Sequence, residues 1–327
     1  MASFAAVALP TCEPNFRPQG VAEEIHGWIS SAPMRALVAE YGDTLPAAGV
    51  GELLAWLDAF SDRHWDLRKQ GRVERDQVKA PSFDSARTEL ILAAATALRL
   101  VNPGRPSHPA YDHLLVLGGL GRACLQRTEY AAHLVRDGVV VVPELAALGS
   151  FRPLTKAETT LPALATSRYE VDAMDVGVRM GFGLEDPLLR ESSDGPVTHQ
   201  SWQARTYQAA GCPKVHVLAA PSSEPELRRA NTPDTYEFWA RRVSLRSTDR
   251  VLVVTSPIYV PFQHTDAIRM LAMQYMCGID TVGFDPGEAT IPLAPEATSP
   301  DRYLQEIRSG ILSMRRLHHA LTESVAA

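Results

Sequence analysis

The sequence predicts an α/β protein: a Rossmann-like, doubly wound, mainly parallel five-stranded sheet preceded by a helical N-terminal domain. Two observations carry this prediction. In the first hundred residues, apolar side chains recur three and four positions apart, the period of amphipathic helices. Further on, short continuous apolar runs alternate with helical stretches, which is typical of strands buried on both faces of a parallel sheet. A chain of 327 residues is long enough for two such units.

The helical domain is predicted over residues 1–105. Its segments "GVAEEIHGWISSAPMRALVAEYG", "GVGELLAWLDAFSDRHWDLRKQ" and "SFDSARTELILAAATALRLV" have helical spacing and are separated by Gly and Pro. The segment "NPGRPSHP" at 102–109 then interrupts the pattern with three prolines and a glycine. We therefore place a domain boundary there and assign residues 106–327 to the α/β domain.

The α/β domain is predicted from five apolar runs and the helical stretches between them. Strands are expected at 114–118, 139–142, 215–219, 251–255 and 279–284. Helices are expected at 122–136, 168–181, 199–210, 233–244, 262–276 and 301–323. Strands that alternate with helices in this way form βαβ units, so the five strands are expected to lie parallel.

Composition excludes several classes of function. The net charge of −6, with both signs interspersed, argues against a nucleic-acid binder. The four cysteines have no metal-ligand or paired spacing, so we expect free thiols in a reducing compartment and no metal site. The N-terminal residues make a poor signal peptide, and the longest apolar run, 90–98, is too short to span a bilayer. These features predict a cytoplasmic location and no membrane segment.

A glycine-rich loop follows the first predicted strand. It contains Gly118, Gly119 and Gly121, and the helix that it opens carries Arg122 and Arg127. Glycines let a ligand approach the backbone, and a helix N-terminus attracts anions. The loop is not a GxGxxG motif and no acidic residue follows at the ribose-binding distance, so a standard NAD site is not expected. Ligand binding and a purely structural turn remain alternatives here.

Two further loops lie at the same expected sheet edge. The long stretch after the second strand offers Arg152, Lys156 and Glu158, and loops of this length are usually functional or disordered. After the third strand, Arg228 and Arg229 precede a helix start. That start contains Asn231, Thr232 and Asp234, and a helix cap explains most of its pattern.

The fourth loop, "VTSPIYVPFQHTDAIRML", follows the fourth strand. Hydroxyls of Thr255 and Ser256 at the strand end suit phosphate oxygens or a substrate hydroxyl. Tyr259 and His264 come next, and His264 is a candidate acid or base, although a single helical His is more often structural. The sequence contains no GxSxG, GxxxxGK[ST] or HExxH motif, which argues against serine hydrolases, P-loop NTPases and zincins.

These four loops, in this order, resemble the YdcF/SanA/ElyC-like family, a bacterial family with domain of unknown function 218. "LLVLGG" with Arg127, "RANTPDT" and "VLVVTSPIYVPFQHTDAIRML" carry the resemblance over roughly residues 110–285. The sequence departs from the family near Tyr259, where a histidine is usual, and two segments, 169–183 and 199–212, compete for its acidic helix. The resemblance implies a Rossmann-like domain with a cleft for a nucleotide-like ligand, S-adenosylmethionine being one type.

The function expected from these features is a cytoplasmic enzyme, a transferase or a hydrolase, that acts on a nucleotide-like or phosphorylated small molecule. The glycines and arginines of the first loop would bind the anion. Asn231, Thr232, Thr255 and Ser256 would also bind the substrate, and Asp234, Tyr259 and His264 would be catalytic. The alternative is a non-catalytic ligand-binding or regulatory module whose helical N-terminal domain contacts a partner. The oligomeric state does not follow from the sequence.

Overall fold

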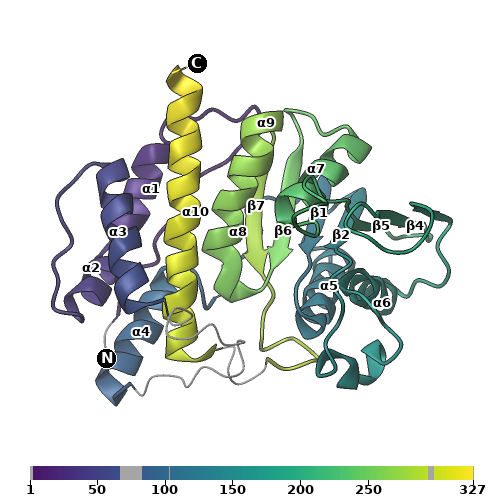
Figure 1. Cartoon of the computed structure of the whole chain (residues 1–327), viewed down its shortest axis with the longest axis horizontal. Helices are drawn as coiled ribbons and strands as arrows, with labels where there is room; N and C mark the ends of the chain where they lie inside the picture. Colours follow the sequence, from purple (N-terminus) through teal and green to yellow (C-terminus); the bar gives the residue numbers. More distant parts are fainter. Residues whose placement is uncertain (1–2, 67–82, 103, 294–297, 327) are drawn as a thin grey trace.

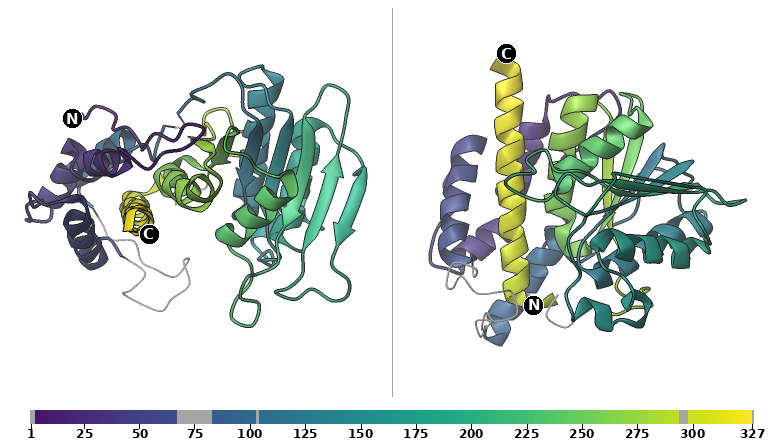
Figure 2. Two further views of the ribbon diagram at one scale, coloured as in Figure 1. Left: turned by 90° about the horizontal axis from the view of Figure 1, so that it is seen from above. Right: turned by 45° about the vertical axis from the view of Figure 1, so that its right-hand side comes forward.

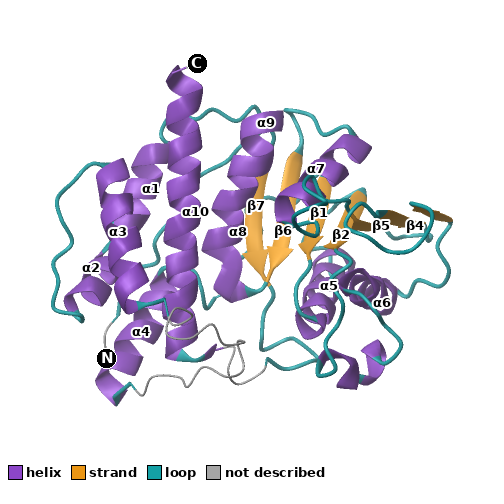
Figure 3. Ribbon diagram, in the orientation of Figure 1, coloured by secondary structure: helices purple, strands orange, loops and turns teal. Residues whose placement is uncertain are grey.

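The computed structural model describes residues 3–66, 83–102, 104–293 and 298–326. Within these residues, a seven-stranded sheet is flanked by helices and joined to a helical N-terminal region (Figures 1 and 3). The strand order is β3-β4-β5-β2-β1-β6-β7. The strands are β1 (His113–Leu117), β2 (Glu144–Gly149), β3 (Leu189–Ser192), β4 (Gln203–Tyr207), β5 (Lys214–Ala219), β6 (Arg250–Thr255) and β7 (Gly278–Gly283).

The sheet is mostly parallel. Strands β5, β2, β1, β6 and β7 run in one direction, whereas β3 and β4 form an antiparallel hairpin on the β5 edge. The predicted parallel α/β class is therefore confirmed in outline, but the sheet is not a strict five-stranded Rossmann sheet. Strand β2, which follows β1 in the sequence, pairs with one side of β1. Strand β6, which comes later, pairs with its other side. The strand order thus reverses between β1 and β6, the position where open α/β sheets bind ligands.

Two sequence predictions within the sheet are wrong. The predicted strand at 139–142 is a connecting segment, with Val139 and Val141 exposed; the second strand is β2, "ELAALG", a few residues later. The predicted helix at 199–210 is replaced by β4, which pairs with β5 from Gln203↔Ala219 to Tyr207↔Val215. The valines of 139–142 favour a strand by composition, and β4 is a strand because it pairs with β5; neither outcome follows from local composition.

Helices cover both faces of the sheet. On one face, α5 (Gly121–Arg136) and α6 (Glu170–Phe182) pack against β1, β2 and β5. On the other, α7 (Thr232–Val243) packs on β2 and β5, and α8 (Val260–Ala267) packs on β6 and β7. Alternate residues of β1 enter the two hydrophobic cores: Leu114 and Val116 face α5 and α6, and Leu115 and Leu117 enter the other core.

The remaining elements are short connections or extend these helices. They are the 3-10 turns η1 (Glu158–Thr160), η2 (Pro162–Leu164) and η3 (Pro257–Tyr259), the π-helical segment η4 (Ile268–Ala272) and α9 (Met273–Tyr275). Together α8, η4 and α9 correspond to the single helix predicted at 262–276. No described helix is both long enough and apolar enough to cross a bilayer.

The N-terminal region is helical, as predicted. It contains α1 (Val21–Ile29), α2 (Ala32–Ala39), α3 (Val50–His64) and α4 (Ser85–Ala97), and the predicted continuation of α3 to residue 70 lies partly outside the described residues. The long helix α10 (Pro300–Ala326) lies between these helices and α8 in two different views (Figures 1 and 2). One hydrophobic core therefore runs from α1–α4 through α10 to the sheet, and the division at residue 105 stays a prediction.

An arginine on α10 joins it to α3 through charge as well as apolar contact. Arg308 donates to Asp58 at 3.0 Å and to Asp62 at 2.8 Å, and its Nε lies 3.5 Å from Asp66. The Arg308 side chain is largely buried, which strengthens its attraction to these carboxylates. Helix α10 is therefore an integral part of the N-terminal region's packing, despite its distance in sequence.

Candidate functional site

The carboxyl ends of β1 and β6 are joined by Arg127, a buried residue of α5. Its guanidinium donates to the carbonyl of Leu117 at 2.8 Å, to the carbonyl of Gly118, and to Ser256 Oγ at 2.9 and 3.0 Å. It also lies over the Tyr259 ring, 5.7 Å from the centroid. Burial lowers the pKa of Arg127. Each of these contacts is internal, so Arg127 fixes the ends of two strands on either side of the order reversal.

The N-terminus of α5 already holds an anion from the protein itself. Glu158 Oε1 accepts a hydrogen bond of 2.7 Å from the backbone N–H of Gly121, the first residue of α5. Arg152 makes a bidentate pair with the same carboxylate at 2.8 and 2.9 Å. Burial on its own raises the pKa of Glu158, but these hydrogen bonds and that from the Thr155 N–H outweigh it and lower the pKa to about 2. The position predicted for a ligand anion is therefore occupied by Glu158.

The three glycines of the loop are explained by close packing. None has a positive φ. A Cβ at Gly118 would lie 2.3 Å from Glu170 Oε1 and 2.6 Å from the carbonyl oxygen of Leu148. A Cβ at Gly121 would lie 2.5 Å from Leu164 Cδ1, and one at Gly119 would lie 3.3 Å from Arg127 Nη1. The glycines thus bring β1, β2 and the Arg127 and Glu170 side chains together.

A second polar group lies at the end of β2. Ser150 follows the strand directly and donates a short hydrogen bond to Glu170 at the start of α6. Arg152 Nε lies 3.8 Å from the same Glu170 carboxylate, and Arg229 donates to Ser150 Oγ at 3.4 Å. Burial raises the pKa of Glu170, and this effect outweighs the lowering by Ser150 and the arginines. We call Ser150, Arg152, Glu170 and Arg229 the edge cluster.

The edge cluster is open to solvent on one side. Ser150 and Glu170 are buried and Arg152 is partly buried, but Arg229 is exposed. No described carboxylate lies within ion-pair distance of Arg229, so its charge is directed at Ser150 and at solvent. Sequence reasoning singled out Arg152 and Arg229 as candidates but missed Ser150 and Glu170, because it placed the second strand too early and so did not find its end.

The segment from Arg228 to Asp234 is a helix cap. Asn231 accepts from the Asp234 N–H at 3.3 Å, and Asp234 accepts from the Asn231 N–H at 2.8 Å, a reciprocal capping box. Asp234 also pairs with Arg228 and accepts from the Ser223 N–H at 3.0 Å. These contacts lower the pKa of Asp234 despite its burial, which alone would raise it. Thr232 opens α7. The cap interpretation therefore accounts for these residues without a ligand.

His264 lies on α8, beside β7 and away from the edge cluster. Its Nε2 is 2.7 Å from the carbonyl of Pro10, which can only accept, so Nε2 carries the proton. Its Nδ1, 3.0 Å from Thr281 Oγ1, then accepts from that hydroxyl. Burial lowers the pKa of His264, which favours this neutral form. Both ring nitrogens are engaged, so the side chain is built into the fold.

The predicted catalytic residues are not brought together. Tyr259 accepts from Arg302 at 2.9 Å and lies against Arg127, whereas Asp234 caps α7 and His264 faces Pro10. Among the contacts of the described chain, none joins any two of Asp234, Tyr259 and His264. Of the other predicted binding residues, Arg122 donates to the Pro292 carbonyl at 3.0 Å, and Thr255 Oγ1 is buried with no hydrogen-bond partner in the described part of the chain.

Comparison with known proteins finds similarity to one family model and to several uncharacterized proteins. Residues 12–99, the region of α1–α4, match the model described as the Rv3785 N-terminal domain. This region resembles that domain. Over nearly the whole chain, relatives include the uncharacterized proteins Rv3785 of Mycobacterium tuberculosis (strain H37Rv) and Mb3814 of Mycobacterium bovis. Each is 28% identical over 340 residues, covering 94% of this chain and 94% of the relative. No solved structure matches the chain significantly.

These findings correct the expected resemblance to the YdcF/SanA/ElyC-like family, which is wrong. The family model and the whole-chain relatives point to Rv3785 instead. The motifs that carried the resemblance have local structural explanations: close packing at the glycines, a capping box at Asn231, and internal hydrogen bonds at Ser256. The nucleotide-like ligand and S-adenosylmethionine, which that resemblance implied, lose their support with it.

Proposed function

We propose that the chain binds a small molecule bearing a carboxylate or phosphate group at the edge cluster, and that Glu170 exchanges a proton with it. One observation carries the proposal. A buried hydroxyl–carboxyl pair, Ser150 and Glu170, lies between Arg152 and the exposed Arg229 at the carboxyl end of β2, next to β1 in the sheet. Ligands of open α/β sheets bind at this edge.

The charge of the edge cluster favours an anion. Arg152 is largely neutralised by its bidentate pair with Glu158, but Arg229 has no described carboxylate within ion-pair distance. A guanidinium presents several N–H donors in a plane that matches the oxygens of a carboxylate or phosphate. An incoming anion would therefore replace water around Arg229 and gain a charge-assisted hydrogen bond beside Ser150.

The state of Glu170 favours acid–base chemistry. A carboxyl whose pKa is raised by burial holds a proton more readily near neutral pH than a surface carboxylate does. Ser150 donates to it directly, so Glu170 is placed to accept a proton from that hydroxyl or from a substrate hydroxyl bound in its place. Transferase and hydrolase chemistry both use such a base. The free, mostly buried cysteines support a reducing compartment such as the cytoplasm as the place of action.

The second candidate is a non-catalytic ligand-binding module whose N-terminal helices contact a partner. It is favoured by the separation of Asp234, Tyr259 and His264, each of which makes structural contacts. Under this alternative, the edge cluster binds its ligand and Glu170 serves only to fix Ser150.

The test is a binding and turnover screen with three single variants, Arg229→Gln, Ser150→Ala and Glu170→Gln. Metabolites that copurify are identified by mass spectrometry, and their affinity is measured by calorimetry. Arg229→Gln is expected to weaken an anionic ligand roughly tenfold or more, the scale of one charge-assisted hydrogen bond. The matched control is Arg63→Gln, an exposed arginine on α3.

The variants also separate the two candidates. An enzyme loses turnover in Glu170→Gln while still binding substrate, whereas a binding module shows no turnover in any form. If Arg229→Gln binds the identified anion as tightly as Arg63→Gln does, the edge cluster is not the binding site.

A further inference from the structure

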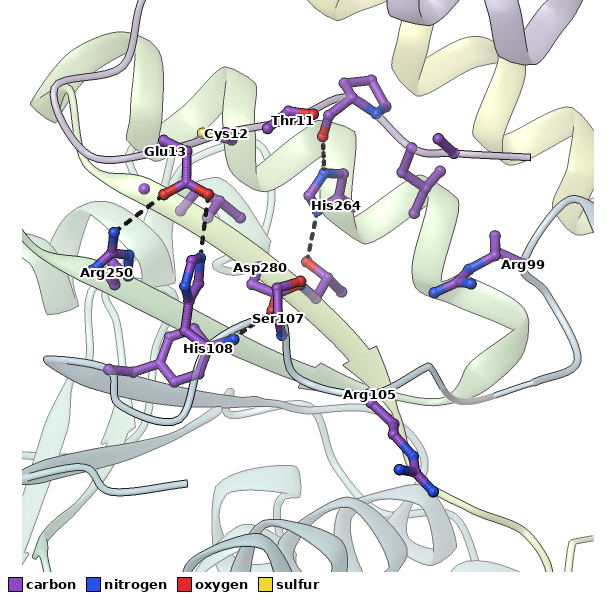
Figure 4. A pocket seen from close by; sticks show the side chains of 17 residues that line it. Thr11, Cys12, Glu13, Arg99, Arg105, Ser107, His108, Arg250, His264 and Asp280 are labelled. Atoms are coloured by element: carbon purple, nitrogen blue, oxygen red, sulfur yellow. Dashed lines mark hydrogen bonds and ion pairs between the residues drawn. The ribbon is translucent and has the colours of Figure 1, made fainter. Parts of the chain in front are cut away.

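A cavity of about 310 Å³ lies away from the edge cluster, beside the contact between the N-terminal segment and β7. Its walls come from residues 8–13, from the segment after α4, from His264 on α8, and from strands β6 and β7 (Figure 4). The N-terminal segment covers the outer edge of β7, where the Ile279 N–H donates to the Cys12 carbonyl at 2.8 Å. The cavity therefore adjoins the contact between the N-terminal region and the sheet.

The carboxylates that line the cavity are already satisfied. Asp280 accepts from the Tyr111 hydroxyl at 2.5 Å and from the Ser107 N–H at 2.7 Å. Glu13 pairs with Arg250 at 3.3 Å and lies 3.2 Å from His108 Nε2 (Figure 4). Among the described residues, no contact joins either carboxylate to Arg99 or Arg105, the other two arginines of the cavity wall.

Arg99 supplies positive charge without a partner. No hydrogen bond or ion pair of its guanidinium is found among the described residues, and it extends from the end of α4 on the opposite side of the cavity from Arg250 (Figure 4). Arg250 Nε is buried and likewise has no hydrogen-bond partner within residues 3–66, 83–102, 104–293 and 298–326. The cavity is thus lined by more cationic donors than its own carboxylates use, which is the charge balance of an anion site.

The backbone at Arg99 has a conformation that is uncommon for a residue with a side chain. Arg99 has a φ of +73°, in the left-handed region, immediately after the last turn of α4. The N–H of Leu100 donates to the Ala95 carbonyl at 2.9 Å and that of Arg99 to the Thr96 carbonyl at 3.1 Å, the bonds of a helix C-terminal motif that usually contains glycine. An arginine there is conformationally unfavourable, and such outliers occur often at ligand sites.

We propose that this cavity binds a small anionic molecule carrying a phosphate or carboxylate group, with Arg99 as its principal contact. The anion would lie between Arg99 and Arg250 and bring the N-terminal segment and β7 together. The proposal is independent of the edge cluster, with which the cavity shares no lining residue.

The decisive variant is Arg99→Gly, because glycine suits the left-handed backbone. It removes the charge while relieving the unfavourable conformation, so its melting temperature is expected to equal or exceed that of the parent. Loss of binding then cannot be attributed to unfolding. The matched control is Ser244→Gly, which changes another left-handed residue (φ +53°) at the end of α7, outside the cavity.

Binding is measured by equilibrium dialysis with inorganic phosphate and with succinate, in chains that also carry Arg229→Gln to weaken the edge cluster. We expect Arg99→Gly to raise the dissociation constant of the preferred probe at least tenfold, with Ser244→Gly unchanged. The proposal is overturned if neither probe binds the Arg229→Gln chain, or if Arg99→Gly leaves binding intact. Probe binding that Arg229→Gln abolishes would instead support the edge cluster alone.

Discussion

The carboxylate of Glu158 occupies the N-terminus of α5, 2.7 Å from the backbone N–H of Gly121. A helix N-terminus attracts anions because its first N–H groups have no intrahelical acceptor. The anion here is supplied by the loop that follows β2, so that loop is fixed over the glycines of the loop that follows β1. Arg152 completes the arrangement by pairing with Glu158 and donating to the Gly119 carbonyl at 2.8 Å.

Replacing Glu158 by Gln is expected to destabilise the protein by about 1–3 kcal/mol at pH 7, after allowance for partial solvent screening. The pKa of Glu158 is lowered from an ordinary 4.5 to about 2, so its stabilising effect is complete above pH 4.5. That effect is lost as the pH falls through about 2. Urea unfolding of parent and variant across this range should show the difference between them shrinking with pH. Glu226→Gln, at an exposed carboxylate, is the control; a constant difference at every pH would contradict the assignment.

Gly118→Ala is expected to destabilise the fold by roughly 1–3 kcal/mol, whereas Gly119→Ala should cost less than about 1 kcal/mol. The Cβ at position 118 would meet the Leu148 carbonyl, part of the sheet backbone that cannot easily move. The Cβ at position 119 would meet only the tip of Arg127 at 3.3 Å. Thermal unfolding of the two variants measures the difference, and equal stabilities would show that close packing does not explain the glycines.

His264 is expected to make stability depend on pH without contributing to proton transfer. Burial lowers its pKa below the ordinary 6.5, so the unfolded chain binds a proton at this position before the folded chain does. The free energy of unfolding should therefore decrease as the pH falls below 6.5, and His264→Gln should remove that component. Unfolding measured between pH 5 and pH 8 provides the test, with the exposed His319→Gln as control. An unchanged pH profile in His264→Gln would refute the buried neutral state.

Thiol reagents are expected to label one cysteine, Cys212, in the native protein and four in denaturant. Cys12, Cys124 and Cys277 are buried, and burial raises the pKa of Cys124 and of Cys277 to about 12, so thiolate is scarce at neutral pH. Cys212 is partly exposed. Mass spectrometry after brief alkylation identifies the labelled residue, and Cys212→Ser should abolish rapid labelling. Rapid labelling of Cys12 would indicate that the N-terminal segment opens from β7.

Much of the fold could be predicted because burial leaves a direct trace in sequence. Strands β1, β5, β6 and β7 are largely continuous apolar runs. In helices α5, α6, α7 and α10, apolar residues recur three and four positions apart. Strand β2 was misplaced because its alanines have low strand propensity, whereas the valines of 139–142 have high propensity but partly face solvent. The hairpin of β3 and β4 was missed because polar side chains dominate it and its stability comes from pairing with β5.

The edge cluster could be predicted only in part. A loop rich in glycine and the arginines at 152 and 229 were visible as unusual residues near an expected sheet edge. The role of Arg127 as an internal clamp, and the occupation of the α5 N-terminus by Glu158, depend on contacts between residues 10 to 129 positions apart. No local pattern encodes such contacts, and the same residues in a different register would have been free for a ligand.

The pairing of Arg308 with Asp58 joins residues 250 positions apart and has a consequence for biosynthesis. Helix α3 and the residues just after it emerge early from the ribosome, with an apolar face and three carboxylates whose partner on α10, Arg308, does not yet exist. In the nascent chain this surface therefore has no α10 to pack against until the C-terminal residues have been translated. A message truncated before α10 is expected to yield a chain that is degraded rather than a shorter folded protein.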